Sequence, residues 1–242
     1  MSSHDHDHPK HLAHHFDDIE QQFDAGKFGI WGFLLTEVLF FSGLFVAYAI
    51  YRSNHPDVFE YAANFLDTTM GAINTCVLLL SSFTAAWAVR AAQLGQRKLL
   101  VNLLIVTVLC AFGFMAIKYV EYSHKYHEGL LWGGAEHSIF KEDPTKVLPE
   151  VIAESDYYNE VKELDPTFRK NLGIFFAIYF CLTGLHGIHV TIGIAVILWL
   201  IMRARRGDFG PENYAAVDFV ALYWHLVDLI WIYLFPLLYL IS

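Results

Sequence analysis

Residues 172–202 read LGIFFAIYFCLTGLHGIHVTIGIAVILWLIM and include no Asp, Glu, Lys or Arg. As a helix, this stretch would be roughly 46 Å long at 1.5 Å per residue. The hydrocarbon core of a bilayer is only about 30 Å thick. The segment therefore predicts a transmembrane helix that tilts or projects beyond the membrane.

Four other segments are also long and apolar enough to cross a bilayer. Together they predict five spans, at about 28–50, 69–89, 99–117, 172–202 and 217–241. The runs are continuously apolar rather than alternating, which favours helices over the strands of a barrel. We therefore expect an all-α polytopic membrane protein, with a bundle of five transmembrane helices in residues 27–242.

The composition agrees with a membrane protein. Of 242 residues, 55% are hydrophobic and 17% are charged, against about 25% charged in ordinary globular chains. The formal net charge of -9 has the wrong sign for a nucleic-acid partner. Cys76, Cys110 and Cys181 lie singly in apolar runs and are predicted to be small buried hydrophobes, because no spacing suits a metal site.

Two polar regions flank or interrupt the predicted spans. Residues 1–26 form a tail rich in His and Asp, a composition that binds metal loosely and favours a disordered surface segment. No apolar run precedes residue 28, so no cleavable signal is expected. The link at about 122–170 is acidic on balance, and we expect it to be a solvated loop rather than a surface for a partner.

Lys and Arg indicate how the spans are oriented. They gather in two short links, with Arg90, Arg97 and Lys98 in one and Arg203, Arg205 and Arg206 in the other, whereas the link between the first two spans has only Arg52. Cytoplasmic loops carry an excess of these residues. The pattern predicts a cytoplasmic N-terminus, an external C-terminus and an external acidic link. The arginines at 203–206 could also bind anionic lipid headgroups.

Glu37 lies near the middle of the first span, where no Lys or Arg of its own helix can reach it. An ionisable side chain in hydrocarbon is costly unless it faces protein or water. Two interpretations stay open. Glu37 is either a neutral carboxylic acid that donates a hydrogen bond to another helix, or a group that meets a cation, a lipid headgroup or water.

His186 and His189 are three positions apart and share one helix face. Two imidazoles on one face could ligate a metal or haem, but a complete site needs three or four ligands. Only His225 adds a further histidine inside a span. We expect hydrogen bonds between helices and no metal site, with close helix packing at the neighbouring glycines Gly184, Gly187 and Gly193.

The fifth span carries Trp224, His225 and Asp228. His225 and Asp228 are three apart, so they could shuttle a proton or simply neutralise one another, and the structural role is favoured. At the outer end of the third span, Lys118 and Glu121 have the same spacing. They are expected to form a surface salt bridge.

Four of these motifs in order resemble subunit III of haem–copper oxidases, most closely that of cytochrome c oxidase. They are GIWGFLLTEVLFF at 29–41, KYVEY at 118–122, TGLHGIHVTIG at 183–193 and YWHLVDLIW at 223–231. The resemblance implies a non-catalytic subunit of an oxygen-reducing, proton-pumping complex, in a bacterial plasma membrane. Such a subunit packs on subunit I, binds phospholipid, and supports proton uptake and sustained turnover, while haem and copper belong to subunits I and II. It also implies that Glu37 lies near bound lipid and that Arg203 contacts a lipid phosphate.

The longer family pattern has seven spans, so a further small subunit could take the place of the two that this chain lacks. Two alternatives stay open. The subunit of a quinol oxidase also has five spans, although it usually has Ser-Asp where this chain has Thr36 and Glu37. A stand-alone proton-coupled transporter would use Glu37, His186 and Asp228, but it predicts inverted repeats that are not evident.

Overall fold

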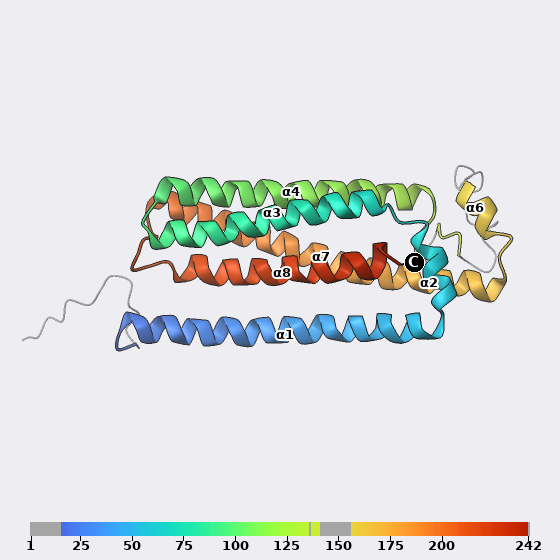
Figure 1. The fold of residues 1–242 in the computed structure, drawn as a ribbon, viewed down its shortest axis with the longest axis horizontal. Helices are drawn as coiled ribbons and strands as arrows, with labels where there is room; N and C mark the ends of the chain where they lie inside the picture. The colour runs from blue at the N-terminus through green and yellow to red at the C-terminus, as the bar shows by residue number, and fades with distance from the viewer. Residues whose placement is uncertain (1–15, 136, 141–155, 242) are drawn as a thin grey trace, which may run out of the picture.

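A computed structural model describes residues 16–135, 137–140 and 156–241. The predicted His-rich tract at 1–15 and much of the acidic link lie outside these residues. The described chain is helical (Figure 1), with α1 Ile19–Asn54, α2 Pro56–Ala63, α3 Thr68–Gln93, α4 Arg97–His127, α6 Asp156–Val161, α7 Pro166–Arg206 and α8 Ala215–Tyr239.

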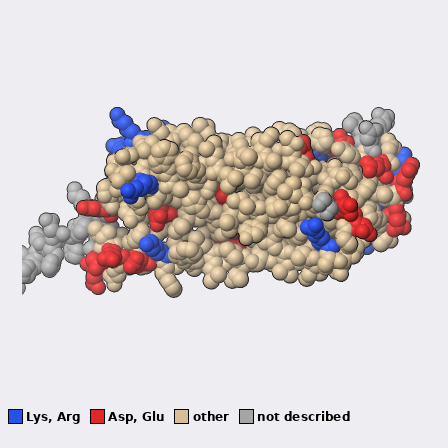
Figure 2. All heavy atoms as spheres, in the orientation of Figure 1, with Lys and Arg blue, Asp and Glu red and all other residues tan. Residues whose placement is uncertain are grey.

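Five of these helices, α1, α3, α4, α7 and α8, are long and apolar enough to cross a membrane. The prediction of five spans is confirmed, and each helix except α8 extends beyond the predicted span at both ends. Charged side chains gather near the two ends of the elongated body, and a broad band without Lys or Arg lies between them (Figure 2). This distribution fits a protein whose middle lies in hydrocarbon and whose ends reach water.

Helices α3, α4, α7 and α8 form a bundle in which successive helices run in opposite directions, and α1 lies alongside it (Figure 1). α1 contacts α7 and α8 through a narrow stripe. Its buried residues are Leu34, Phe41 and Tyr48, which are spaced by seven positions and therefore share one face. The other faces of α1 are exposed, so the helix offers most of its apolar surface to lipid or to a partner.

The cysteines correct one prediction. Cys76 and Cys181 are exposed and Cys110 is intermediate, so the expectation that all three are buried is wrong. Apolar sequence predicts burial only when the solvent is water. In a bilayer the outward face of a helix is also apolar, and a thiol can lie there without cost.

Part of the acidic link packs against the bundle, in contrast to the expected solvated loop. Leu130, Ile139 and Val161 are fully buried. The approach is close at Gly173 of α7, where an added Cβ would lie 3.3 Å from the backbone nitrogen of Gly133. The net charge of the link did not reveal its few large apolar residues, and these residues fix its position.

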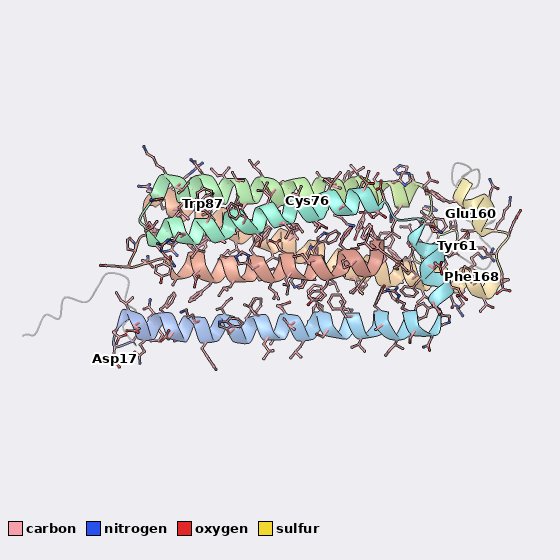
Figure 3. The ribbon with its side chains drawn as sticks, in the orientation of Figure 1. Asp17, Tyr61, Cys76, Trp87, Glu160 and Phe168 are labelled. Atoms are coloured by element: carbon pink, nitrogen blue, oxygen red, sulfur yellow. The ribbon has the colours of Figure 1, made fainter. Side chains whose placement is uncertain are left out.

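At the same end of the bundle, α2 is joined to α6 and α7. The Tyr61 hydroxyl donates to Glu160 at 2.7 Å, and its ring meets that of Phe168 edge-on at 5.6 Å (Figure 3). Partial burial, and then the neighbouring Glu160 carboxylate, raise the pKa of the Tyr61 phenol. The contact thus connects the segment after α1 to the link before α7.

Candidate functional site

Glu37 of α1 meets His189 of α7, with 2.9 Å between Oε2 and Nε2. Both side chains are largely shielded, at 19% and 14% exposure. The other ring nitrogen, Nδ1, lies 2.7 Å from the Leu185 carbonyl oxygen, which can only accept, so Nδ1 carries a proton. One further proton is therefore shared between Nε2 and Oε2, and the pair is uncharged in sum.

The third helix at this point is α8. The Tyr223 hydroxyl donates to the backbone carbonyl of His189 at 2.9 Å, and the Phe41 ring of α1 meets the imidazole edge-on at 5.1 Å. Polar and aromatic contacts therefore hold α1, α7 and α8 together near the middle of the bundle. Glu37 has no Lys or Arg partner among the described residues, and the imidazole takes that place.

His186 lies one helical turn from His189 but has different surroundings. It is fully buried, and neither ring nitrogen has a hydrogen-bond partner among the described residues. Its ring contacts those of Phe114 and Trp231, with centroid distances of 5.5 and 5.3 Å. The expected hydrogen bond between helices is therefore present at His189, whereas for His186 the expectation is wrong within the described residues, because aromatic rings surround its imidazole.

The fifth span contributes separate contacts rather than one pair. His225 Nδ1 lies 2.7 Å from the Ser82 hydroxyl of α3, and Trp224 Nε1 donates to Ser81 at 2.8 Å. Asp228 is 2% exposed and lies close to the same Ser82 side chain. The predicted pairing of His225 with Asp228 is wrong, because Ser82 on the neighbouring helix is the partner of His225.

The glycines near the histidine pair differ in their packing. A Cβ on Gly193 would lie 2.5 Å from the Trp224 ring, whereas Gly187 has nothing within 4 Å and Gly184 only the Tyr122 hydroxyl at 3.9 Å. Close packing is thus confirmed at Gly193 alone. Gly184 and Gly187 instead line an apolar groove between α4 and α7.

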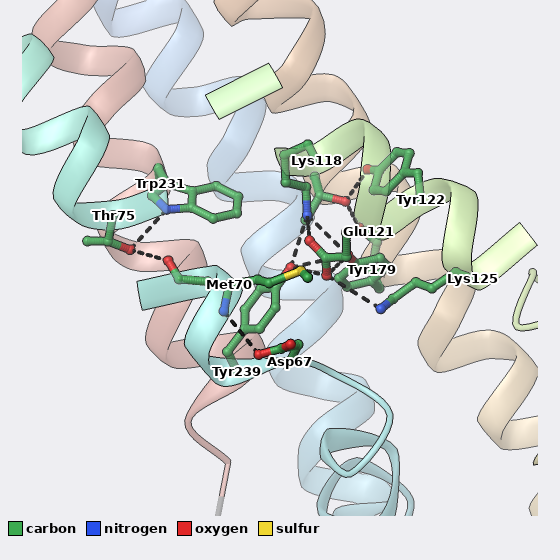
Figure 4. Close-up of polar contacts among 12 residues, drawn as sticks. Asp67, Met70, Thr75, Lys118, Glu121, Tyr122, Lys125, Tyr179, Trp231 and Tyr239 are labelled. Carbon is green, nitrogen blue, oxygen red and sulfur yellow. Dashed lines mark hydrogen bonds and ion pairs between the residues drawn. The ribbon is translucent and has the colours of Figure 1, made fainter. Parts of the chain in front are cut away.

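Lys118 and Glu121 form a buried cluster, which corrects the predicted surface salt bridge (Figure 4). Their side chains are 7% and 4% exposed, and Lys118 Nζ lies 2.7 Å from Glu121 Oε2. Lys125 Nζ approaches Glu121 Oε1 at 3.4 Å. The hydroxyls of Tyr179 and Tyr239 each donate to that same oxygen at 2.7 Å.

The sequence contained part of this signal. Lys118, Glu121 and Lys125 are spaced three and four apart, so they share a helix face, and buried Phe114 lies on that face. Tyr179 and Tyr239 come from α7 and α8. Their convergence on Glu121 depends on how the helices pack, and no local pattern encodes it.

Arg203 lies in the last turn of α7, at the opposite end of the bundle. Its Nε donates to Asp208 at 3.0 Å, and the guanidinium lies 4.9 Å from both the Trp199 and Phe209 rings. The neighbouring Arg205 and Arg206 are exposed. Arg203 is thus oriented by the protein and is still partly open to a ligand.

Among the residues that the structure describes, no three His, Cys, Asp or Glu side chains lie close enough to hold a metal ion. The buried polar groups described above mostly bond to one another across helices. The fold and these contacts together define a five-helix integral membrane subunit whose polar residues join its helices.

The chain belongs to the cytochrome c oxidase subunit III family, whose model matches residues 12–128 and 135–242. It is accordingly a subunit of a haem–copper terminal oxidase complex, which implies subunits I and II as partners. A probable quinol oxidase subunit 3 of Staphylococcus saprophyticus is 24% identical, over 96% of this chain and 98% of its own length. The quinol oxidase subunit 3 of Bacillus spizizenii is 27% identical, over 93% of this chain and 92% of its own length. The cytochrome c oxidase subunit 3 of Synechocystis is 29% identical, over 90% of this chain and 76% of its own length.

Proposed function

We propose that this chain is the non-catalytic subunit III of a cytochrome c oxidase, packed on subunit I and supporting proton uptake and sustained turnover there. The observation that carries the proposal is the Glu37–His189 pair. The family motif residue Glu37 bonds to a second motif residue, His189, across helices. Haem and copper would be held by subunits I and II.

A quinol oxidase is the second candidate. The relatives named as quinol oxidase subunits match over 98% and 92% of their own lengths, whereas the cyanobacterial cytochrome c oxidase subunit is matched over 76%. This chain is therefore closer in length to the quinol oxidase subunits, which favours a quinol as the electron donor. Thr36-Glu37, in place of the usual Ser-Asp, favours cytochrome c.

Three further parts of the proposal concern the membrane. The N-terminus, with the arginines at 203–206, would face the cytoplasm of a bacterial cell, and the C-terminus would face outward. Arg203 would hold a phospholipid phosphate there, with Arg205 and Arg206 assisting, and Glu37 would lie near bound lipid. A small subunit would cover α1, since only 17% of the apolar membrane-spanning part of α1 is buried within this chain.

The test is purification of the chain from native membranes under mild conditions. Co-elution with haem-bearing subunits supports the oxidase subunit, and oxygen consumption with reduced cytochrome c or with a quinol identifies the donor. Activity with quinol alone would replace the first candidate by the second. Recovery of the chain alone, with proton-coupled transport in vesicles, would contradict both.

A further inference from the structure

A groove of about 660 Å³ lies between α1 and α8. Its lining comes from the C-terminal parts of both helices, which lie at the end of the bundle opposite to the C-terminus of α7 (Figure 1). Its walls are mainly apolar and include Phe45, Ala49 and Leu237. Because α1 and α8 are both membrane spans, the groove lies on a part of the surface that is at the depth of the bilayer. Its volume suits an acyl chain.

Within the described part of the chain, Arg52 is the one charged side chain that lines this groove. It lies in the last turn of α1, where a span meets the headgroup region. Among the described residues it makes no ion pair. Its one hydrogen bond runs from Nη1 to the Tyr48 hydroxyl, at 3.2 Å.

Tyr48 fixes the position of this cation. Its hydroxyl donates to the Leu237 carbonyl of α8, an oxygen in the last turn that has no partner within its own helix. The hydroxyl therefore offers Arg52 only its lone pairs. A guanidinium has five N–H donors, so four stay available beside the groove.

We propose that this groove binds a phospholipid, with an acyl chain between α1 and α8 and the phosphate on the Arg52 guanidinium. Arginine pairs with phosphate through two parallel hydrogen bonds, and the cation at the membrane surface selects an anionic group over a neutral one. Charge complementarity thus favours a lipid over an apolar partner helix, which would leave the cation unpaired. The site is separate from the lipid proposed at Arg203 and does not depend on the identity of the electron donor.

The test uses the intact oxidase complex after delipidation, titrated with phosphatidylglycerol or with a diacylglycerol of the same chains, and examined by native mass spectrometry. Arg52→Gln should weaken the phosphatidylglycerol complex by about tenfold or more, since a charge-assisted bond is lost. It should leave diacylglycerol binding unchanged. Arg52→Lys should restore part of the preference. If Arg203→Gln also loses a lipid, the double variant should lose both.

A second pair of variants tests the groove itself. Ala49→Phe fills the groove and should expel the lipid although Arg52 is intact. Ala47→Phe, on the same helix but outside the lining, should not. Unchanged phosphatidylglycerol binding in both Arg52→Gln and Ala49→Phe would overturn the proposal, while the function proposed above would stand. Loss of the subunit from the Ala49→Phe complex, with lipid binding in Arg52→Gln unchanged, would overturn it in favour of a protein helix in the groove.

Discussion

Glu37 and His189 are 152 positions apart in the chain, and their side chains meet at 2.9 Å. The Nδ1–H of His189 donates a hydrogen bond to the Leu185 carbonyl, so the pair can exist as a neutral acid with a neutral imidazole, or as a carboxylate with an imidazolium. Both forms are uncharged in sum. This is how a carboxyl group can lie within a span without a Lys or Arg partner.

Glu37→Gln should therefore preserve assembly and the initial rate of oxygen reduction, because an amide N–H can still donate to Nε2. Glu37→Ala leaves Nε2 without its partner, at about 1–3 kcal/mol, and should lose activity sooner during continuous turnover. The measurement is the initial rate and the time course of the reconstituted complex. Thr36→Ala is the control, since its exposed hydroxyl bonds only within its own helix. Loss of the initial rate in Glu37→Gln, with normal haem content, would make Glu37 catalytic.

Gly193→Ala should destabilise the bundle by roughly 1–3 kcal/mol, because its Cβ would overlap the buried Trp224 ring. Gly187→Ala adds the same methyl group to the same helix where nothing lies within 4 Å, and it should be tolerated. The two variants are compared by heating the complex in detergent and measuring how much of this subunit the complex retains at each temperature. Equal melting temperatures would show that the Gly193 contact is not tight in the protein.

Glu121→Gln should be among the most destabilising single changes. It leaves Lys118 and Lys125 buried with no counter-charge from Glu121, and breaking a buried ion pair costs about 3–5 kcal/mol. Glu60→Gln, on an exposed position of α2, should change the free energy of unfolding by less than about 0.5 kcal/mol. Both are measured by thermal denaturation. Similar small effects at the two sites would argue that water reaches the cluster.

Arg203→Ala should lower the phospholipid retained by the purified complex, as measured by lipid mass spectrometry. Because Arg205 and Arg206 are exposed beside it, the triple change should lower it further. Asp208→Asn removes the carboxylate that competes for the guanidinium, so it should retain at least as much lipid as the unmodified protein. Unchanged lipid in the triple variant would exclude this site.

The Tyr61–Glu160 contact should weaken at alkaline pH. The pKa of the phenol is raised from the ordinary value of 10.0, so its contribution to stability is complete below about pH 10 and is lost as the pH rises above it. The protection of α6 amides from hydrogen exchange, measured relative to an unstructured chain at the same pH, should therefore fall above pH 10, and Tyr61→Phe should remove that step. A step that persists in Tyr61→Phe would assign it to another group.

The sequence alone determined the class of fold. A run of about twenty mainly apolar residues can be satisfied in a bilayer only as a helix or as part of a closed barrel, so five such runs without strand alternation predict five helices without any knowledge of their packing. The sequence also predicts that Glu37 has a partner, since an isolated carboxyl group in a span needs one wherever the helix lies.

The partner of each polar group depends on how the helices pack. Glu37 could have met any neighbouring helix, and His225 bonds to Ser82 rather than to Asp228 three positions away. The spacing of Lys118 and Glu121 predicts a surface pair, but Tyr179 and Tyr239 from two other helices converge on Glu121 in the interior. Helix periodicity gives the face on which a side chain lies, but the azimuth and axial shift of each helix against its neighbours set what that face meets. Those depend on contacts far apart in the chain, such as Gly193 against Trp224.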